Sequence, residues 1–129
     1  MTAELQKIAF IGTGVMGLSM AGHLMAAGHR LTIHTRTKAR AEPLLAQGAL
    51  WAKSPRDAAD GADLAISMVG FPEDVEATHL GSAGTLQASR PPSVIIDMTT
   101  SRPSLAIRIA DVAIAKNIQS LSLIHISEP

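Results

Sequence analysis

The chain contains no cysteine, which excludes disulfide bonds, thiolate catalysis and cysteine-ligated zinc sites. It also has no excess of either charge. Eleven basic and eleven acidic side chains balance, without a long run of either sign, so we expect neither nucleic acid nor a membrane as a partner. The five histidines lack the close spacing of metal ligands, and we therefore predict no metal site.

The first residues, "MTAELQKIAF", match neither a signal peptide nor a membrane span. Glu4 and Lys7 precede an apolar run that is too short for either role. We expect a cytoplasmic protein. The 129 residues are 47% hydrophobic, which is enough apolar mass for the core of one globular domain.

Short apolar runs alternate with stretches of helical periodicity along the whole chain. The runs predict strands at 8–11, 30–35, 49–52, 62–69 and 91–98. Helices are predicted between them and at 103–117, with Met16, Met20, Leu24 and Ala27 at helical spacing in the first, and Leu105, Ile109, Val112 and Ala113 on one face of the last. This alternation predicts an α/β fold of the Rossmann type, a doubly wound parallel sheet with its ligand at the carboxyl ends of the strands.

A glycine pattern follows the first predicted strand. In "IGTGVMG", Gly12, Gly14 and Gly17 form G-x-G-x-x-G between a strand and a helix. Gly12 permits a tight turn, Gly14 allows close approach of a pyrophosphate, and Gly17 lets helix and strand pack closely. We predict dinucleotide binding by these glycines with Val15 and Met16, where free N–H groups open the helix. The alternative is an ordinary glycine turn.

The second predicted strand leads into a basic turn, "HTRTKAR". A site for NAD usually has Asp or Glu there, about 20 residues after the glycines, and this stretch has none. Arg36 and Thr37 offer donors to a 2′-phosphate instead. We predict NADP (NADPH) as the cofactor, with NAD disfavoured. The alternative is a solvated basic turn, which suits Lys38 and Arg40 better than Arg36.

Four stretches together resemble the β-hydroxyacid dehydrogenase family, which includes 3-hydroxyisobutyrate dehydrogenases and semialdehyde reductases. They are "IAFIGTGVMGLSMAGHLMAAGH", "HTRTKARAEPLLAQGA", "SMVGFPEDVEATHLGSAGTL" and "IIDMTTSRPSLAIRIA", within residues 7–120. The resemblance implies that Val69, Gly70 and Asp74 lie against the cofactor, that Thr100 contacts it near the nicotinamide, and that Ser101 lies near the substrate. Thr100 and Ser101 could equally cap the next helix.

The resemblance also implies hydride transfer between NADP(H) and a small 3-hydroxy acid or its semialdehyde, in an intact protein that is a homo-oligomer. The family's catalytic lysine follows an "SGG" motif on the helix that leads to a helical second domain. This chain contains neither, and Lys116 comes too early to replace the lysine, so we predict no catalytic residue here and an inactive 129-residue chain. A non-catalytic NADP-binding module and an imine reductase-like enzyme are the alternatives.

The last nine residues, "LSLIHISEP", depart from the family pattern. Their codons would match the end of a common transposase-based sequencing-library adapter. We therefore interpret 1–120 as a dinucleotide-binding domain whose reading frame is truncated before the second domain, and 121–129 as an adapter-derived tail. The alternative is a genuine divergent strand, because apolar and polar residues alternate there.

Overall fold

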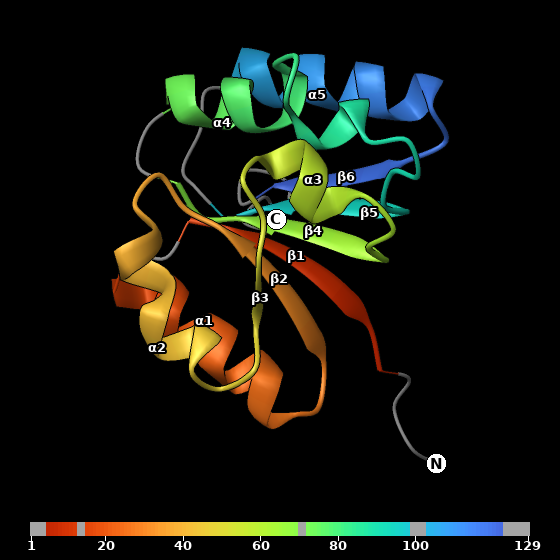
Figure 1. The fold of residues 1–129 in the computed structure, drawn as a ribbon. Coiled ribbons are helices and arrows are strands. Elements are labelled where there is room, and N and C mark those ends of the chain that lie inside the picture. Colours follow the sequence, from red (N-terminus) through yellow and green to blue (C-terminus); the bar gives the residue numbers. More distant parts are fainter. Residues whose placement is uncertain (1–4, 13–14, 70–71, 99–102, 123–129) are drawn as a thin grey trace, which may run out of the picture.

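The computed structural model describes residues 5–12, 15–69, 72–98 and 103–122, and six strands within them form one sheet (Figure 1). These are β1 (Lys7–Ile11), β2 (Arg30–His34), β3 (Leu50–Trp51), β4 (Leu64–Ser67), β5 (Val94–Asp97) and β6 (Gln119–Ser122). All neighbours pair in parallel, in the order β3-β2-β1-β4-β5-β6. The order switches direction at β1, so the predicted doubly wound sheet is confirmed.

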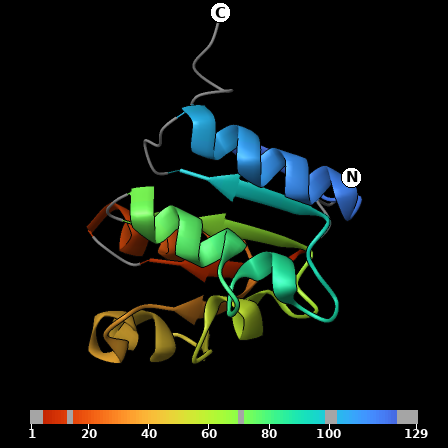
Figure 2. The ribbon, with the colours of Figure 1, turned by 90° about the horizontal axis from the view of Figure 1, so that it is seen from above.

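Helices cover both faces of the sheet. They are α1 (Val15–Ala26), α2 (Glu42–Leu45), α3 (Pro55–Ala59), α4 (Pro72–Leu80) and α5 (Pro103–Ala115), with 3-10 turns η1 (Lys38–Ala41) and η2 (Thr85–Gln87). Figure 1 shows α1 and α2 on one face and α3, α4 and α5 on the other. In Figure 2, α4 and α5 lie side by side. No helix of the described ranges is long and apolar enough to cross a membrane.

The central strand β1 contributes to two separate hydrophobic cores. Ile8 and Phe10 pack with residues of α1, α2 and β2 on one face, whereas Ala9 and Ile11 pack with residues of α3, β4 and β5 on the other. Successive side chains of a strand point to opposite faces, so a strand covered on both sides must be apolar throughout. This requirement explains the unbroken apolar run "IAFI".

The buried faces of two helices differ from the apolar stripes predicted for them. Met16 is 73% exposed, and α1 turns Ala21 to the sheet instead. Met20 and Leu24 of the predicted stripe pack against the core beside Ala21, so the stripe is confirmed at these two positions. In α5, Leu105 and Ile109 are buried as expected, but Val112 is 36% exposed and lies off the buried face.

The helix predicted in 38–48 divides into two short pieces. A 3-10 turn, η1, precedes the four-residue α2, and Pro43 lies in the first turn of α2. Proline has no N–H to donate and clashes with a preceding helical turn, so a single continuous helix through Pro43 is disfavoured.

The edge strand β6 includes Leu121 and Ser122, the first residues of the predicted tail. They pair with Ile96 and Asp97 of β5. Backbone pairing at a sheet edge makes few demands on sequence, so either origin of these residues is compatible with the pairing. Residues 123–129 lie outside the described part of the chain.

Candidate cofactor-binding site

The turn after β1 has room for glycine only. Gly12 has φ +95°, and a Cβ there would lie 2.3 Å from the Met68 carbonyl oxygen, which follows β4. The Gly12 N–H donates to the His34 carbonyl oxygen at 3.0 Å. Gly12 therefore brings the carboxyl ends of β1, β2 and β4 together, as the tight turn of a dinucleotide site requires.

The third glycine lets α1 start close to this turn. A Cβ at Gly17 would lie 2.7 Å from the Gly12 carbonyl oxygen. The predicted packing roles of Gly12 and Gly17 are thus confirmed. Val15 begins α1 and Met16 lies exposed in its first turn, so the free N–H groups of this turn open at the carboxyl edge of the sheet. Gly14 lies outside the described residues.

The basic turn after β2 is held by a buried threonine. Thr35 is 4% exposed, and its hydroxyl donates to the Thr37 carbonyl oxygen. Lys38 lies with Nζ 6.0 Å from the ring centroid of Trp51. The sequence had left open whether Lys38 binds the cofactor or only faces solvent. Arg36 extends from this turn with its side chain 81% exposed. The turn therefore presents Arg36 at the carboxyl edge of β2.

Arg36 and Asp74, predicted separately as cofactor contacts, form an ion pair and hydrogen bond. Arg36 follows β2, and Asp74 lies in the first turn of α4, which begins shortly after β4. Since β1 lies between β2 and β4, the pair connects the two sides of the glycine turn. The Asp74 side chain is only 17% exposed, so its carboxylate is the more enclosed partner.

Val69, predicted to lie against the cofactor, is placed beside the glycine turn. Its Cγ1 would lie 3.2 Å from a Cβ at Gly12, and its side chain packs against two core clusters. Gly70, Thr100 and Ser101, which were also predicted in this site, fall outside the described residues.

The sequence reasoning missed a buried chain of polar side chains next to this edge. Thr85, His79 and Ser67 are each fully buried, and Asp97 is 5% exposed. His79 Nδ1 is 2.7 Å from Thr85 Oγ1, and His79 Nε2 is 2.9 Å from Ser67 Oγ. Ser67 Oγ is 2.9 Å from Asp97 Oδ1. The chain joins η2, α4, β4 and β5.

The direction of these hydrogen bonds fixes the tautomer of His79. Ser67 has one hydroxyl proton, which it donates to Asp97. It must therefore accept from His79, whose Nε2 carries the proton, and the remaining Nδ1 accepts from Thr85. Burial lowers the pKa of His79 from 6.5 to about 4, because the charged imidazolium would lose its hydration. At neutral pH this histidine is uncharged and all four groups are satisfied.

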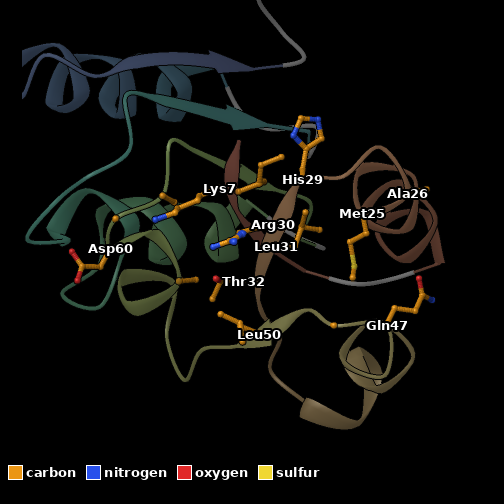
Figure 3. A pocket seen from close by; sticks show the side chains of 15 residues that line it. Lys7, Met25, Ala26, His29, Arg30, Leu31, Thr32, Gln47, Leu50 and Asp60 are labelled. Carbon is orange, nitrogen blue, oxygen red and sulfur yellow. The ribbon is translucent and has the colours of Figure 1, made fainter. Parts of the chain in front are cut away.

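A cavity lies at the opposite end of the sheet. Its volume is about 610 Å³, and Lys7, Arg30 and Asp60 line it at the amino ends of the strands (Figure 3). Doubly wound sheets bind their ligands at the carboxyl ends, so this cavity is not the predicted cofactor site. Lys116, which the sequence excluded as a catalyst, follows α5 and donates from Nζ to the Leu86 carbonyl oxygen at 2.7 Å.

Comparison with known proteins identifies the family. The model of a family described as the NAD binding domain of 6-phosphogluconate dehydrogenase matches residues 7–123. The structure of Mycobacterium tuberculosis 3-hydroxyisobutyrate dehydrogenase with L-serine superposes with a TM-score of 0.81 at 28% identity, over 92% of this chain and 40% of that one. This chain belongs to the β-hydroxyacid dehydrogenase family.

Other relatives are matched over a similar share of their length. The oxidoreductase YkwC of Bacillus subtilis (strain 168) is 46% identical over 90% of this chain and 40% of its own length. The mitochondrial 3-hydroxyisobutyrate dehydrogenase-like protein 1 of Arabidopsis thaliana is 45% identical over 93% of this chain and 36% of its own. An imine reductase from Myxococcus stipitatus in complex with NADP+ has a TM-score of 0.78 at 26% identity, over 90% of this chain and 39% of that one. The chain thus spans about two fifths of such β-hydroxyacid dehydrogenase relatives.

Proposed function

We propose that this chain is the NADP-binding part of a 3-hydroxyisobutyrate dehydrogenase-like enzyme. The whole enzyme would transfer hydride between NADP(H) and a small 3-hydroxy acid or its semialdehyde. The observation that carries the proposal is the Gly12 turn at the carboxyl edge, with the first turn of α1 open beside it and Arg36 at the end of β2. The cofactor supplies the hydride chemistry, and the protein supplies binding and orientation.

The residues of the carboxyl edge suit a dinucleotide. Gly12, Gly14 and Gly17 would let the backbone approach the pyrophosphate, and the N–H groups from Val15 onward would bind it at the positive end of α1. Arg36 and Thr37 would donate to the 2′-phosphate of the adenosine ribose. The exposed guanidinium of Arg36 has the planar donor geometry that a phosphate accepts bidentately.

The β4 and β5 side of the same edge would hold the nicotinamide. Val69 forms a wall next to Gly12, and we assign Gly70 to this wall. Asp74 would hold the cofactor from the adjacent position where it pairs with Arg36. Thr100 would contact the cofactor near the nicotinamide, and Ser101 would lie near the substrate. Proton transfer belongs to a lysine of a second domain, so we assign no catalytic residue to the present chain.

The intact protein is proposed to be a cytoplasmic homo-oligomer without a metal, a nucleic acid or a membrane as partner. Residues 1–120 would form the cofactor domain and 121–129 an adapter-derived tail. Amplifying the source DNA across the codon for Ser120 tests this division. A reading frame that continues into an "SGG" motif and a later lysine supports it, whereas the same nine residues in the source contradict it.

The binding experiment is a titration of the 129-residue chain with NADPH and NADH at one ionic strength. We expect tighter binding of NADPH, and a loss of at least tenfold in NADPH affinity in Arg36→Ala, the scale of one charge-assisted contact. Equal affinities for both nucleotides, or no loss in the variant, would contradict the choice of NADP.

An imine reductase is the second candidate, because the neighbour from Myxococcus stipitatus shares this domain and was crystallised with NADP+. The two candidates differ beyond the cofactor domain. Turnover by the full-length gene product on 3-hydroxyisobutyrate, lost when its downstream lysine is replaced, favours the dehydrogenase. Turnover on cyclic imines without dependence on a lysine favours the reductase.

A further inference from the structure

The structure places a carboxylate beside the arginine that follows β2, a strand end that has no acidic residue of its own. No acidic residue occurs between Arg30 and Ala41, yet Asp74 reaches this position from α4 and pairs with Arg36. The two residues are 38 positions apart. An acidic residue at the end of β2 favours NAD in related folds, because it binds the free ribose hydroxyl and repels a 2′-phosphate.

We propose that Asp74 sets the cofactor preference of this site by competing with the 2′-phosphate for Arg36. With NADH, the ion pair between Arg36 and Asp74 remains in place. With NADPH, the guanidinium must turn from the carboxylate to the phosphate. The chain is therefore less selective for NADPH than the basic turn alone implies. This inference rests on the proposed function.

The exposure of the two partners determines how the competition proceeds. Arg36 is 81% exposed and carries a long flexible side chain, so it can change partners without moving the backbone. Asp74 is 17% exposed and lies on α4, so its carboxylate stays where it is. An ion pair with one solvent-exposed partner is weak, because water competes for the exposed group. A phosphate monoester carries nearly two negative charges at pH 7, so Arg36 binds it in preference to the carboxylate.

The remaining effect of Asp74 is repulsion. Once Arg36 has turned to the phosphate, the carboxylate faces a dianion with its own countercharge removed. Two like charges near a protein surface repel each other by an amount that depends on distance and screening. Removing the charge of Asp74 frees Arg36 in advance and abolishes this repulsion, and both changes favour NADPH over NADH.

The test measures the dissociation constants of NADPH and NADH for the 129-residue chain and for Asp74→Asn. Asparagine keeps the size and one acceptor oxygen of the side chain and removes the charge. We expect NADPH to bind about fivefold more tightly to the variant, the upper end of what one surface ion pair contributes. NADH affinity should change by less than about twofold by the same reasoning. Glu76→Gln is the matched control. Glu76 lies on the same helix but pairs with Arg108 of α5, at 3.2 Å, instead of with Arg36.

Each outcome separates this inference from the proposed function. An unchanged NADPH to NADH ratio in Asp74→Asn, or an equal change in Glu76→Gln, overturns the inference and leaves the proposed function standing. Failure of the unsubstituted chain to bind either nucleotide overturns both. If circular dichroism shows that Asp74→Asn does not fold, Asp74→Ser takes its place and must show the same shift in the ratio.

Discussion

Helix α4 contacts the carboxyl edge of the sheet in two different ways. At its start, Asp74 forms an ion pair with an arginine that is 81% exposed. At its end, His79 is fully buried in the hydrogen-bond chain from Thr85 to Asp97. The first contact carries formal charge and can exchange partners with water or a ligand. The second contains a neutral histidine, and its buried groups cannot exchange their hydrogen bonds for bonds to water.

The difference teaches which polar contacts support the fold and which adjust the site. Removing one member of a buried chain leaves other groups without partners, at a cost of about 1–3 kcal/mol for each. Removing one member of an exposed ion pair returns the other to water at almost no cost. We therefore expect the His79 contact to govern stability and the Arg36 contact to govern affinity.

The largest effect is expected for His79→Leu. Leucine fills part of the space but leaves the Thr85 and Ser67 hydroxyls without the imidazole between them. The free energy of unfolding should fall by roughly 2–4 kcal/mol, because two buried groups lose a partner. Urea unfolding monitored by circular dichroism measures the change. His23→Leu, at an exposed position of α1, is the control and should change stability by less than about 0.5 kcal/mol. Similar losses in both variants would remove the distinction between the two contacts.

The second largest effect is expected from acid, which should lower the stability that buried His79 provides. The pKa of His79 is lowered from 6.5 to about 4 in the folded state. Its contribution to stability is therefore complete above pH 6.5 and is lost as the pH falls toward 4, by up to about 3 kcal/mol. Urea unfolding at a series of pH values should show this slope in the unsubstituted chain and a smaller one in His79→Leu. The same slope in both would mean that other groups cause the acid sensitivity.

Ser67→Ala should have an intermediate effect. The substitution removes the acceptor of His79 Nε2 and one donor to Asp97, while the remaining contacts of both residues stay. We expect a loss of about 1–2 kcal/mol, less than for His79→Leu, because His79 and Asp97 each lose this one partner but keep another contact. Thermal and urea unfolding measure it, with Ser19→Ala on the exposed side of α1 as the comparison. A larger loss than in His79→Leu would show that Ser67, not His79, contributes most to the stability of these hydrogen-bonded side chains.

The smallest effect on stability is expected for Arg36→Ala. The free energy of unfolding should change by at most about 1 kcal/mol, because Arg36 is exposed although Asp74 is largely enclosed. Arg108→Ala breaks a second ion pair of α4, with both partners exposed, and should change stability no more than this. The two variants should differ in NADPH affinity alone, which falls only in Arg36→Ala. A stability loss of 2 kcal/mol or more in Arg36→Ala would show that the ion pair also supports the fold.

The elements that the sequence predicted well are those that depend on local pattern. The apolar runs predicted the strands β1 to β5, since strands covered on both faces must be apolar throughout. The glycine spacing predicted the geometry at Gly12 and Gly17, because no other residue fits there. The periodicity of α1 was right for Met20 and Leu24, which pack against the core, but wrong for Met16, which is 73% exposed.

Contacts between distant residues were beyond sequence reasoning. The His79 chain joins residues 12 and 30 positions apart, and a lone histidine in a polar helix gives no sign of burial. The one available signal is that Ser67 and Asp97 both occupy strand ends that the predicted sheet brings together. Similarly, Arg36 and Asp74 were each predicted as cofactor contacts, but their pairing depends on the position of α4, which the pattern does not specify.

The single tryptophan of the chain gives these experiments an optical probe. Trp51 ends β3, with its ring centroid 5.5 Å from that of His34 and the Lys38 ammonium 6.0 Å from it. Its fluorescence therefore originates from one position, next to the turn that carries Arg36. Reduced nicotinamide absorbs in the range where indole emits, so bound NADPH or NADH would quench this emission by energy transfer. Unlabelled protein can thus report unfolding and nucleotide binding in the same cuvette.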